Sequence, residues 1–522
     1  MTVTRRQVLR SAGALLPAIA ALSGGAGWSF ADAPELLIER QPFAEDHVRK
    51  LADALAAEPW QDVRIAMPPG WENLTYDQYR DIRFNPEKSL WKGEPHRFSF
   101  DLFHSGFLFT APVDVHIVEN GEAARIAYSP ALFTFGPQAP TTDGKTDLHY
   151  AGFRLRYPIN SPDYDDEFVV FQGASYFRGV GKGLLYGLSA RGLAIATGQP
   201  GGEEFPMFRA FWVRKPDPAA TTVVVEALLD SPSVTGAYKF SIKPGEDTQM
   251  DVELVLFPRR DLPHVGIAPM TSMFLLDPLS KPVDDFRPSV HDSDGLMMLT
   301  GAGEWLWRPL ANHKTLQVSA FMDQSPRGFG LMQRKRSYRD FLDLESRYER
   351  RPSLWAEPVG DWGPGAVELY EIPTEIETND NIVAFWQPKE PLKQGQSYAF
   401  VYRLHWCADW PLEGDQAVAR TVFSGSGVDP DYAASPPSYD PDLRLYIVEF
   451  AGGDLSGELT PEVTASAGVI GNVHAARNEM ANTTRLSFEH NVSGADLSEL
   501  RAVLKRGATP VSETWLFRWT RR

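Results

Sequence analysis

The sequence predicts a mostly β protein built from antiparallel strands, with a sandwich architecture favoured. Three observations predict it. Short runs of alternating apolar and polar residues recur along the chain, Gly, Pro, Asn and Asp bound these runs, and apolar residues at helical spacing are scarce. Alternating runs form strands with one buried face, and two such sheets bury these faces against each other.

The first residues have the pattern of an export signal. Arg5 and Arg6 precede an apolar, small-residue stretch over about residues 12–26, and small residues suited to cleavage follow. Paired arginines before a weakly hydrophobic stretch are typical of the twin-arginine route, and this stretch is too short and glycine-rich to span a bilayer. We therefore predict that residues 1–31 are a twin-arginine signal peptide. The mature protein is then expected in the periplasm, without stable membrane insertion after cleavage.

Charge and composition limit the partners. The formal net charge is −17, and loss of Arg5, Arg6 and Arg10 with the signal makes the mature chain three charges more negative. Nucleic acid and anionic lipid both require basic surface, so neither is expected as a main partner. One cysteine, Cys407, excludes an intrachain disulfide and a metal site of several thiolates, and no metal or other cofactor is predicted. The 14 tryptophans would suit stacking on sugar rings, although most aromatic rings belong to cores.

The individual elements follow from the local patterns. Helical spacing occurs over residues 44–57 and again over residues 337–348, where Pro352 follows. A hairpin is predicted where Tyr238–Lys243 alternates, a turn follows over residues 243–247, and Met250–Leu254 alternates again. Further strands are predicted over residues 222–228, 397–406, 443–450, 484–488 and 513–520.

A change of composition divides the chain. Residues 411–441 are rich in Gly, Asp, Ser and Pro, which is typical of a domain boundary. We predict a large β-sandwich over residues 34–406, a linker region over 407–441 and a smaller immunoglobulin-type sandwich over 442–522.

Two acidic clusters with neighbouring aromatic residues are the candidates for chemistry. Asp292 lies in the first, which Trp305 follows closely, and Asp380 lies in the second, with Trp386 six residues later. Polysaccharide hydrolysis needs one carboxylic acid to protonate the leaving oxygen and usually a second carboxylate that activates water or attacks the sugar. From spacing alone, either aspartate could instead cap a turn. Asp294 would share a face with Asp292 on a strand and serves as the comparison residue.

Several long stretches resemble one known family, the periplasmic glucan biosynthesis proteins OpgG and OpgD, also called MdoG and MdoD. The twin-arginine signal makes the chain most similar to the OpgD branch. The stretches that carry the resemblance are Glu87–Trp91, Gly173–Arg178, Leu188–Ala194, Gly266–Phe274, Arg351–Trp355 and Phe450–Leu455.

The resemblance implies a fold and a reaction. The fold is a large N-terminal sandwich of the galactose mutarotase type followed by an immunoglobulin-like domain. The reaction is inverting cleavage of the β-1,2-glucan backbone of osmoregulated periplasmic glucans, with Asp380 as general acid and Asp292 as general base. Tyr348 matches a position that lines the cleft in this family. Trp305, Trp386 and Arg178 complete the substrate-binding candidates.

The outcome of the reaction stays open at this point. The segment Thr374–Thr378, just before Asp380, is more acidic than expected of a typical member of this family. Loops near the general acid can decide whether water or a sugar hydroxyl attacks. Hydrolysis, transglycosylation and cyclisation therefore remain alternatives. A different alternative is a non-catalytic scaffold that binds glucan and presents it to a membrane glucan synthase, the candidate protein partner.

Overall fold

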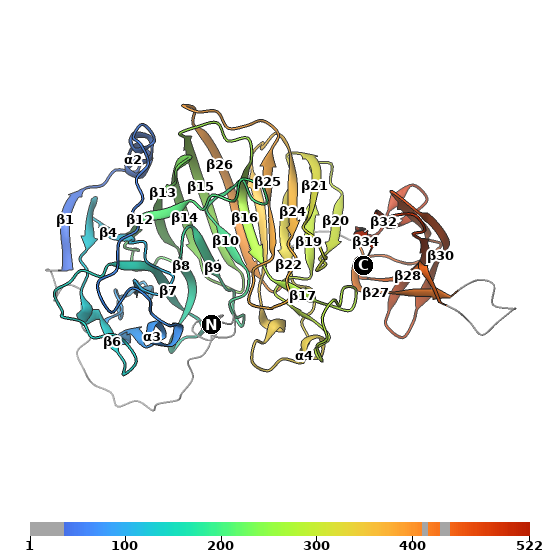
Figure 1. The fold of residues 1–522 in the computed structure, drawn as a ribbon, viewed down its shortest axis with the longest axis horizontal. Helices are drawn as coiled ribbons and strands as arrows, with labels where there is room; N and C mark the ends of the chain where they lie inside the picture. The colour runs from blue at the N-terminus through green and yellow to red at the C-terminus, as the bar shows by residue number, and fades with distance from the viewer. Residues whose placement is uncertain (1–35, 410–415, 429–438, 522) are drawn as a thin grey trace. The chain divides into compact units, whose positions relative to one another are not determined.

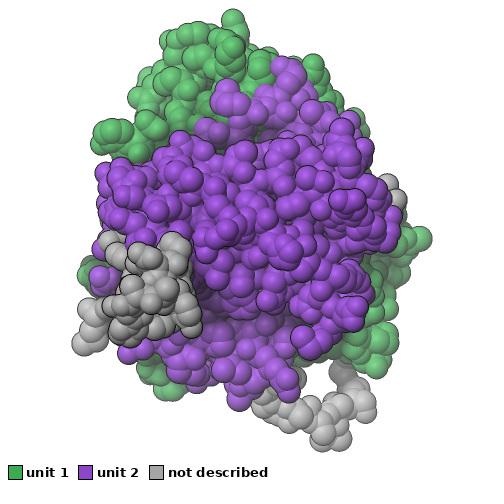
Figure 2. Space-filling model, turned by 90° about the vertical axis from the view of Figure 1, so that its right-hand side faces the viewer, with its two compact units in different colours: residues 1–271, 350–368, 385–408 green, residues 272–349, 369–384, 409–522 purple. Residues whose placement is uncertain are grey.

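The computed structural model describes residues 36–409, 416–428 and 439–521, so the predicted signal peptide lies outside the described residues (Figure 1). The chain divides into two compact units (Figure 2). The first comprises residues 1–271, 350–368 and 385–408, and the second comprises residues 272–349, 369–384 and 409–522.

Two large sheets form most of the first unit. The first sheet has the order β1 (Leu37–Pro42), β5 (Glu122–Ile126), β4 (Asp114–Glu119), β12 (Met207–Arg214), β13 (Val223–Asp230), β14 (Val234–Lys243), β15 (Thr248–Pro258), β26 (Tyr398–Cys407) and β23 (Ser353–Val359). The second has the order β16 (Val265–Ser272), β10 (Ser189–Arg191), β9 (Tyr176–Gly179), β8 (Tyr164–Gln172), β7 (Tyr150–Ser161) and β3 (Ser99–His104).

Aromatic side chains fill the space between these two sheets. The ring of Phe171 on β8 lies 5.2 Å from that of Phe211 on β12, and the ring of Phe177 on β9 lies 5.3 Å from that of Phe240 on β14. This is the predicted sandwich. The predicted hairpin is also present, since β14 and β15 pair antiparallel with Lys243 opposite Gln249.

Shorter elements complete the first unit. Helix α2 (His47–Ala56) corresponds to the helix expected over residues 44–57, and its Val48 and Ala52 pack against Trp212 of β12. The remaining elements are α3 (Tyr76–Arg80), β2 (Ile82–Phe84), η3 (Pro86–Lys88), η4 (Pro130–Leu132), β6 (Phe133–Phe135) and β11 (Ala194–Ile195). Strands β24 (Pro364–Glu371) and β25 (Ile382–Pro388) contribute residues to both units.

The second unit also contains facing sheets. One has the order β22 (Gly328–Met332), β19 (Gly295–Leu299), β20 (Trp305–Pro309), β34 (Thr514–Thr520), β32 (Leu497–Arg506) and β29 (Thr460–Ala465). The other is four-stranded, with the order β27 (Val418–Val428), β28 (Tyr439–Ala451), β31 (Thr483–Asn491) and β30 (Val469–Asn478). Shorter elements are β17 (Phe274–Leu276), β18 (Val290–His291), β21 (Gln317–Gln324), α4 (Tyr338–Phe341), η5 (Tyr348–Arg350, whose last residue belongs to the first unit) and β33 (Thr509–Pro510).

The C-terminal strands form the second predicted sandwich. Trp515 on β34 lies 6.0 Å from the ring of Tyr446 on β28 and 6.1 Å from that of Phe488 on β31, so the two sheets share an aromatic core. Strand β34 also pairs in parallel with β20, with Trp515 opposite Trp307. The mostly β fold class is confirmed. Strand β27 lies within the stretch 407–441 predicted as a linker, and the predicted domain boundaries stay a prediction.

The helix expected over residues 337–348 is much shorter than its apolar spacing indicates. Helix α4 ends at Phe341 because Leu342 adopts a left-handed backbone with φ +54°. The Asp343 side chain then accepts hydrogen bonds from the backbone N–H groups of Glu345 and Ser346, which fixes a turn instead of a further helical turn. The prediction of a helix through Tyr348 was therefore wrong. No helix within the described ranges is long and apolar enough to cross a membrane.

Candidate functional site

Asp292 lies directly after a two-stranded ribbon in the second unit. Strand β17 pairs with β18, with Phe274 opposite His291, and the backbone N–H of Asp292 donates to the carbonyl of Met273 at 2.9 Å. The Asp292 side chain has no exposed surface. Because β18 ends at His291, Asp292 and Asp294 do not lie on one strand, and the condition under which they were expected to share a face is not met.

His291 and Tyr348 pack beneath this ribbon. The His291 ring stacks on Phe274 at 5.3 Å and meets the edge of Phe341 at 5.1 Å, while Phe341 lies 5.8 Å from Tyr348. The Gln333 amide donates to the carbonyl of Tyr348 at 3.2 Å. Burial lowers the pKa of His291 to about 3, so its ring is neutral at neutral pH. The structure thus brings the predicted cleft residue Tyr348 into the same cluster as the segment that carries Asp292.

Asp380 lies on an exposed loop between β24 and β25. The loop is closed at its base, where the N–H of Ile372 donates to the carbonyl of Asn381 at 2.9 Å. The buried Asn381 amide then makes three hydrogen bonds. Its Oδ1 accepts from the N–H of Phe274 at 2.8 Å, and its Nδ2 donates to the carbonyls of Phe274 and Ile372, each at 2.9 Å. The residue that follows Asp380 is therefore fastened to β17.

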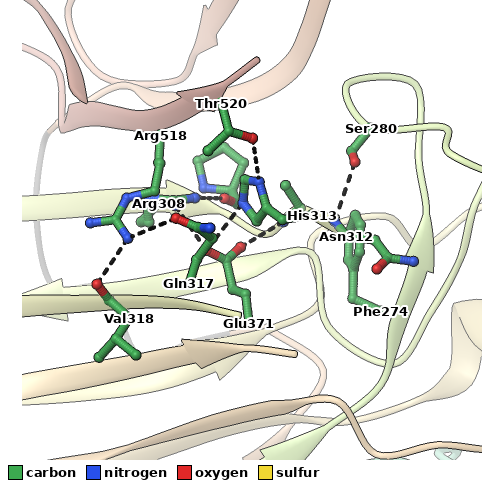
Figure 3. A network of polar contacts seen from close by, with 12 residues as sticks. Phe274, Ser280, Arg308, Asn312, His313, Gln317, Val318, Glu371, Arg518 and Thr520 are labelled. Carbon is green, nitrogen blue, oxygen red and sulfur yellow. Dashed lines mark hydrogen bonds and ion pairs between the residues drawn. The ribbon is translucent and has the colours of Figure 1, made fainter. Parts of the chain in front are cut away.

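Asn312 fixes the other end of this loop. Its Nδ2 donates to the carbonyl of Thr374 at 2.7 Å, and its Oδ1 accepts from the N–H of Thr374 at 3.1 Å. Figure 3 shows Asn312 beside Ser280, whose hydroxyl accepts from the Asn312 N–H at 3.2 Å.

A buried ion network lies next to the start of the loop (Figure 3). Glu371, the last residue of β24, lies 3.0 Å from Arg308 and 3.5 Å from His313, and it accepts from the N–H of Ala311 at 2.7 Å. Burial would raise the pKa of Glu371, but Arg308 and His313 keep it below its usual value. Buried contacts therefore hold the loop at both ends, at Glu371 and at Asn381.

Arg287 ties the loop to two further segments. Its guanidinium contacts Glu377 of the loop at 2.7 Å, Asp285 at 2.7 Å and Asp343 at 2.8 Å. Arg287 is 5 % exposed, so three carboxylates converge on one buried cation. The acidic segment before Asp380 noted in the sequence thus has an ion-pair partner, Arg287. Because Arg287 also contacts Asp343, it joins the loop to the turn that ends α4.

Asp294 belongs to a separate charge cluster. Its Oδ1 lies 2.6 Å from Lys335 Nζ, its Oδ2 accepts from the Lys335 N–H at 2.8 Å, and Lys335 also approaches Asp277 at 3.5 Å. Although burial raises the pKa of a carboxyl, Lys335 holds the pKa of Asp294 well below its usual range. Burial raises the pKa of Asp277, which is farther from Lys335. Asp294 is therefore an ionised structural anchor.

The other predicted substrate residues are not members of the cluster that contains Tyr348. Trp305 begins β20 in the second unit and is 9 % exposed. Arg178 and Trp386 belong to the first unit, where the Arg178 Nε donates to the Ser189 hydroxyl at 2.7 Å. Trp386 has no exposed surface and packs near Trp362, so in this structure its faces are not open to a sugar ring.

Sequence reasoning missed Arg287, Asn312 and Lys335 as residues that build the site. Each contacts a partner about 40 to 90 positions away, and no local pattern signals such a pairing. Among the residues that the structure describes, no group of three or more His, Cys, Asp or Glu side chains is arranged to hold a metal ion.

Comparisons with known proteins agree on one family. Residues 43–519 match the family "Periplasmic glucan biosynthesis protein, MdoG". "Glucans biosynthesis protein G" of Vibrio cholerae is 52% identical over 482 residues, covering 92% of this chain and 87% of the relative. The protein of the same name from Shewanella frigidimarina is 50% identical over 481 residues, with 92% and 85% covered. Since these relatives carry the name of protein G, the likeness to OpgD, which rests on the signal, stays a prediction.

A solved structure gives a weaker likeness. A galactose mutarotase related enzyme from Lactobacillus acidophilus aligns with 49% of this chain and 94% of its own, at 7% identity and a TM-score of 0.20.

Proposed function

Because the chain belongs to the periplasmic glucan biosynthesis family, we propose that it acts on the backbone of a β-1,2-linked glucan by inverting glycoside chemistry. In this proposal Asp380 is the general acid that protonates the leaving oxygen, and Asp292 is the base that accepts the proton of the attacking hydroxyl group. The linkage and the two roles come from the family resemblance. The periplasmic location and the part in glucan biosynthesis are those of the family.

One observation carries the proposal. The segments that hold Asp292 and Asp380 lie far apart in the sequence, yet both are bonded to adjacent residues at the start of β17. Met273 accepts from the N–H of Asp292, and Phe274 makes two hydrogen bonds with Asn381, the neighbour of Asp380. Turns alone would not require both segments to be bonded to the start of one strand. Inverting chemistry requires two carboxyl groups on either side of one glycosidic bond, which this arrangement would serve.

The two carboxyl groups also differ in their surroundings. Asp380 is exposed, so a glycosidic oxygen of a bulky glucan can approach it directly. Asp292 is fully enclosed, so a proton reaches it through an intervening water or substrate hydroxyl rather than by direct contact with the attacking oxygen.

These roles serve both outcomes of the reaction. If water attacks, the product is a shorter glucan, and if a glucan hydroxyl attacks, the product is a transferred or cyclised glucan. The loop that carries Asp380 is fastened by Arg287, Asn312 and Asn381, so the acid keeps its position while either acceptor enters.

The test is incubation of the purified mature protein with linear β-1,2-glucan. We expect the size distribution to change. If water attacks, the first-formed reducing end is the α-anomer, which proton NMR detects. Shorter products indicate hydrolysis, and longer or cyclic products indicate transfer. Binding of glucan with no change in size would contradict the proposal and favour the scaffold alternative.

A further inference from the structure

A cavity lies within the second unit, next to the segment that carries Asp292. Its volume is about 400 Å³, and residues from two loops, from β20, from β22–α4 and from β27 line it. This volume is within the range of small-molecule sites, about 300–1,000 Å³. Asp294 lines the cavity and follows Asp292 by two residues, so at most about 7 Å of chain separates the two positions.

The wall of this cavity is polar and fixed. The Arg334 guanidinium makes two hydrogen bonds to Glu513, at 2.6 and 2.8 Å, and a third to the carbonyl of Ala419 at 2.9 Å. It also lies 3.5 Å from the centre of the Trp307 ring. Lys335 is paired with Asp294 at 2.6 Å. Because Arg334 and Lys335 already have carboxylate partners, this part of the wall offers polar atoms without a large unbalanced charge, which suits a neutral ligand rich in hydroxyl groups.

Two further features point to a ligand. Ser289 lines the cavity and is 1 % exposed, and its hydroxyl has no hydrogen-bond partner among the residues that the structure describes. Buried hydroxyl groups are almost always paired, so a ligand hydroxyl would satisfy this one. Phe423 also lines the cavity and is 46 % exposed, which offers an apolar ring beside the polar wall. An apolar ring next to hydroxyl-binding groups is the combination that recognises a sugar.

We propose that this cavity is a saccharide subsite that holds a glucosyl unit of the glucan, one or a few units away from the bond at Asp292 and Asp380. Ser289 hydrogen-bonds a sugar hydroxyl there, and Phe423 packs against the sugar ring. The inference rests on the proposed function, because it takes the ligand to be the same glucan. It adds a second contact region, which favours long chains over short ones.

The experiment measures glucan binding by titration calorimetry in the mature Asp380→Asn protein, so that turnover does not consume the ligand. The probe is a linear β-1,2-gluco-oligosaccharide long enough to bind the parent tightly. We expect Ser289→Ala to raise Kd about 3- to 10-fold, the value of one hydrogen bond, without lowering the thermal midpoint. Phe423→Ala should raise Kd by a similar factor. The matched control is Tyr164→Ala, an exposed aromatic residue of the first unit, which should leave Kd unchanged.

The outcomes separate the two proposals. If the unsubstituted protein binds and converts glucan but Ser289→Ala and Phe423→Ala leave Kd unchanged, the subsite is refuted and the proposed function stands. A lower thermal midpoint in Ser289→Ala would also refute it, because the hydroxyl would then have a structural partner. If the unsubstituted protein neither binds nor converts glucan, both proposals fail.

Discussion

The hydrogen bonds of Asn381 give a prediction whose size can be worked from the structure. Asn381→Ala removes three hydrogen bonds and leaves the N–H and carbonyl of Phe274 and the carbonyl of Ile372 without this partner. A hydrogen bond contributes about 0.5–1.5 kcal/mol and a buried group left unpaired costs about 1–3 kcal/mol, so we expect a loss of roughly 2–5 kcal/mol in the free energy of unfolding. That is a large part of a typical stability of about 5–15 kcal/mol.

The same substitution tests the position of the proposed acid. Asp380 precedes Asn381, and a displacement of about 1 Å of a catalytic group can cost about 10²-fold in rate. We therefore expect kcat on β-1,2-glucan to fall about 10²-fold in the fraction that remains folded, measured beside urea unfolding and circular dichroism. The matched control is Asn379→Ala, because Asn379 is exposed and makes a single 3.2 Å bond to the Thr374 hydroxyl. Its kcat should stay within about twofold of the unsubstituted value. A folded Asn381→Ala protein with unchanged kcat would refute the reasoning that this anchor places Asp380.

Three further predictions follow from particular residues. Asp294→Asn removes the close partner of Lys335 and should lower the free energy of unfolding by about 3–5 kcal/mol, measured in urea; a loss below about 1 kcal/mol would contradict its anchoring role. The lowered pKa of His291, about 3 in the fold against 6.5 in the unfolded chain, means that unfolding takes up a proton between these pH values. Stability should therefore fall as the pH drops, by roughly 2 kcal/mol from pH 7 to pH 5, and His291→Leu should remove that share of the slope. Replacing Arg5 and Arg6 by Lys should leave precursor in the cytoplasm on cell fractionation, whereas an unchanged periplasmic yield would contradict the twin-arginine assignment.

Local patterns were enough to predict several of the strands. Alternation with bounding turns located the hairpin of β14 and β15, and the helical face of Val48 located α2, because each pattern reflects burial of a single face. The helix over residues 337–348 failed for a non-local reason. Asp343 is held by Arg287, 56 positions away, and the chain turns at Leu342 to allow it.

The site was less predictable than the fold. The motifs contained both aspartates, but nothing in their spacing indicated that Asn381 reaches Phe274, 107 positions away. The comparison of Asp294 with Asp292 assumed that both residues lie on one strand, but β18 ends at His291. Trp386 illustrates a further limit, since an aromatic residue beside an acidic motif can belong to the core, as its complete burial shows.

The most direct test of the central claim is the turnover of β-1,2-glucan by the Asp380→Asn protein. Asparagine keeps the shape of the side chain but has no transferable proton. We expect kcat to fall at least about 10²-fold, with glucan Kd and the circular dichroism spectrum unchanged. A folded Asp380→Asn protein that converts glucan at the unsubstituted rate would contradict the account.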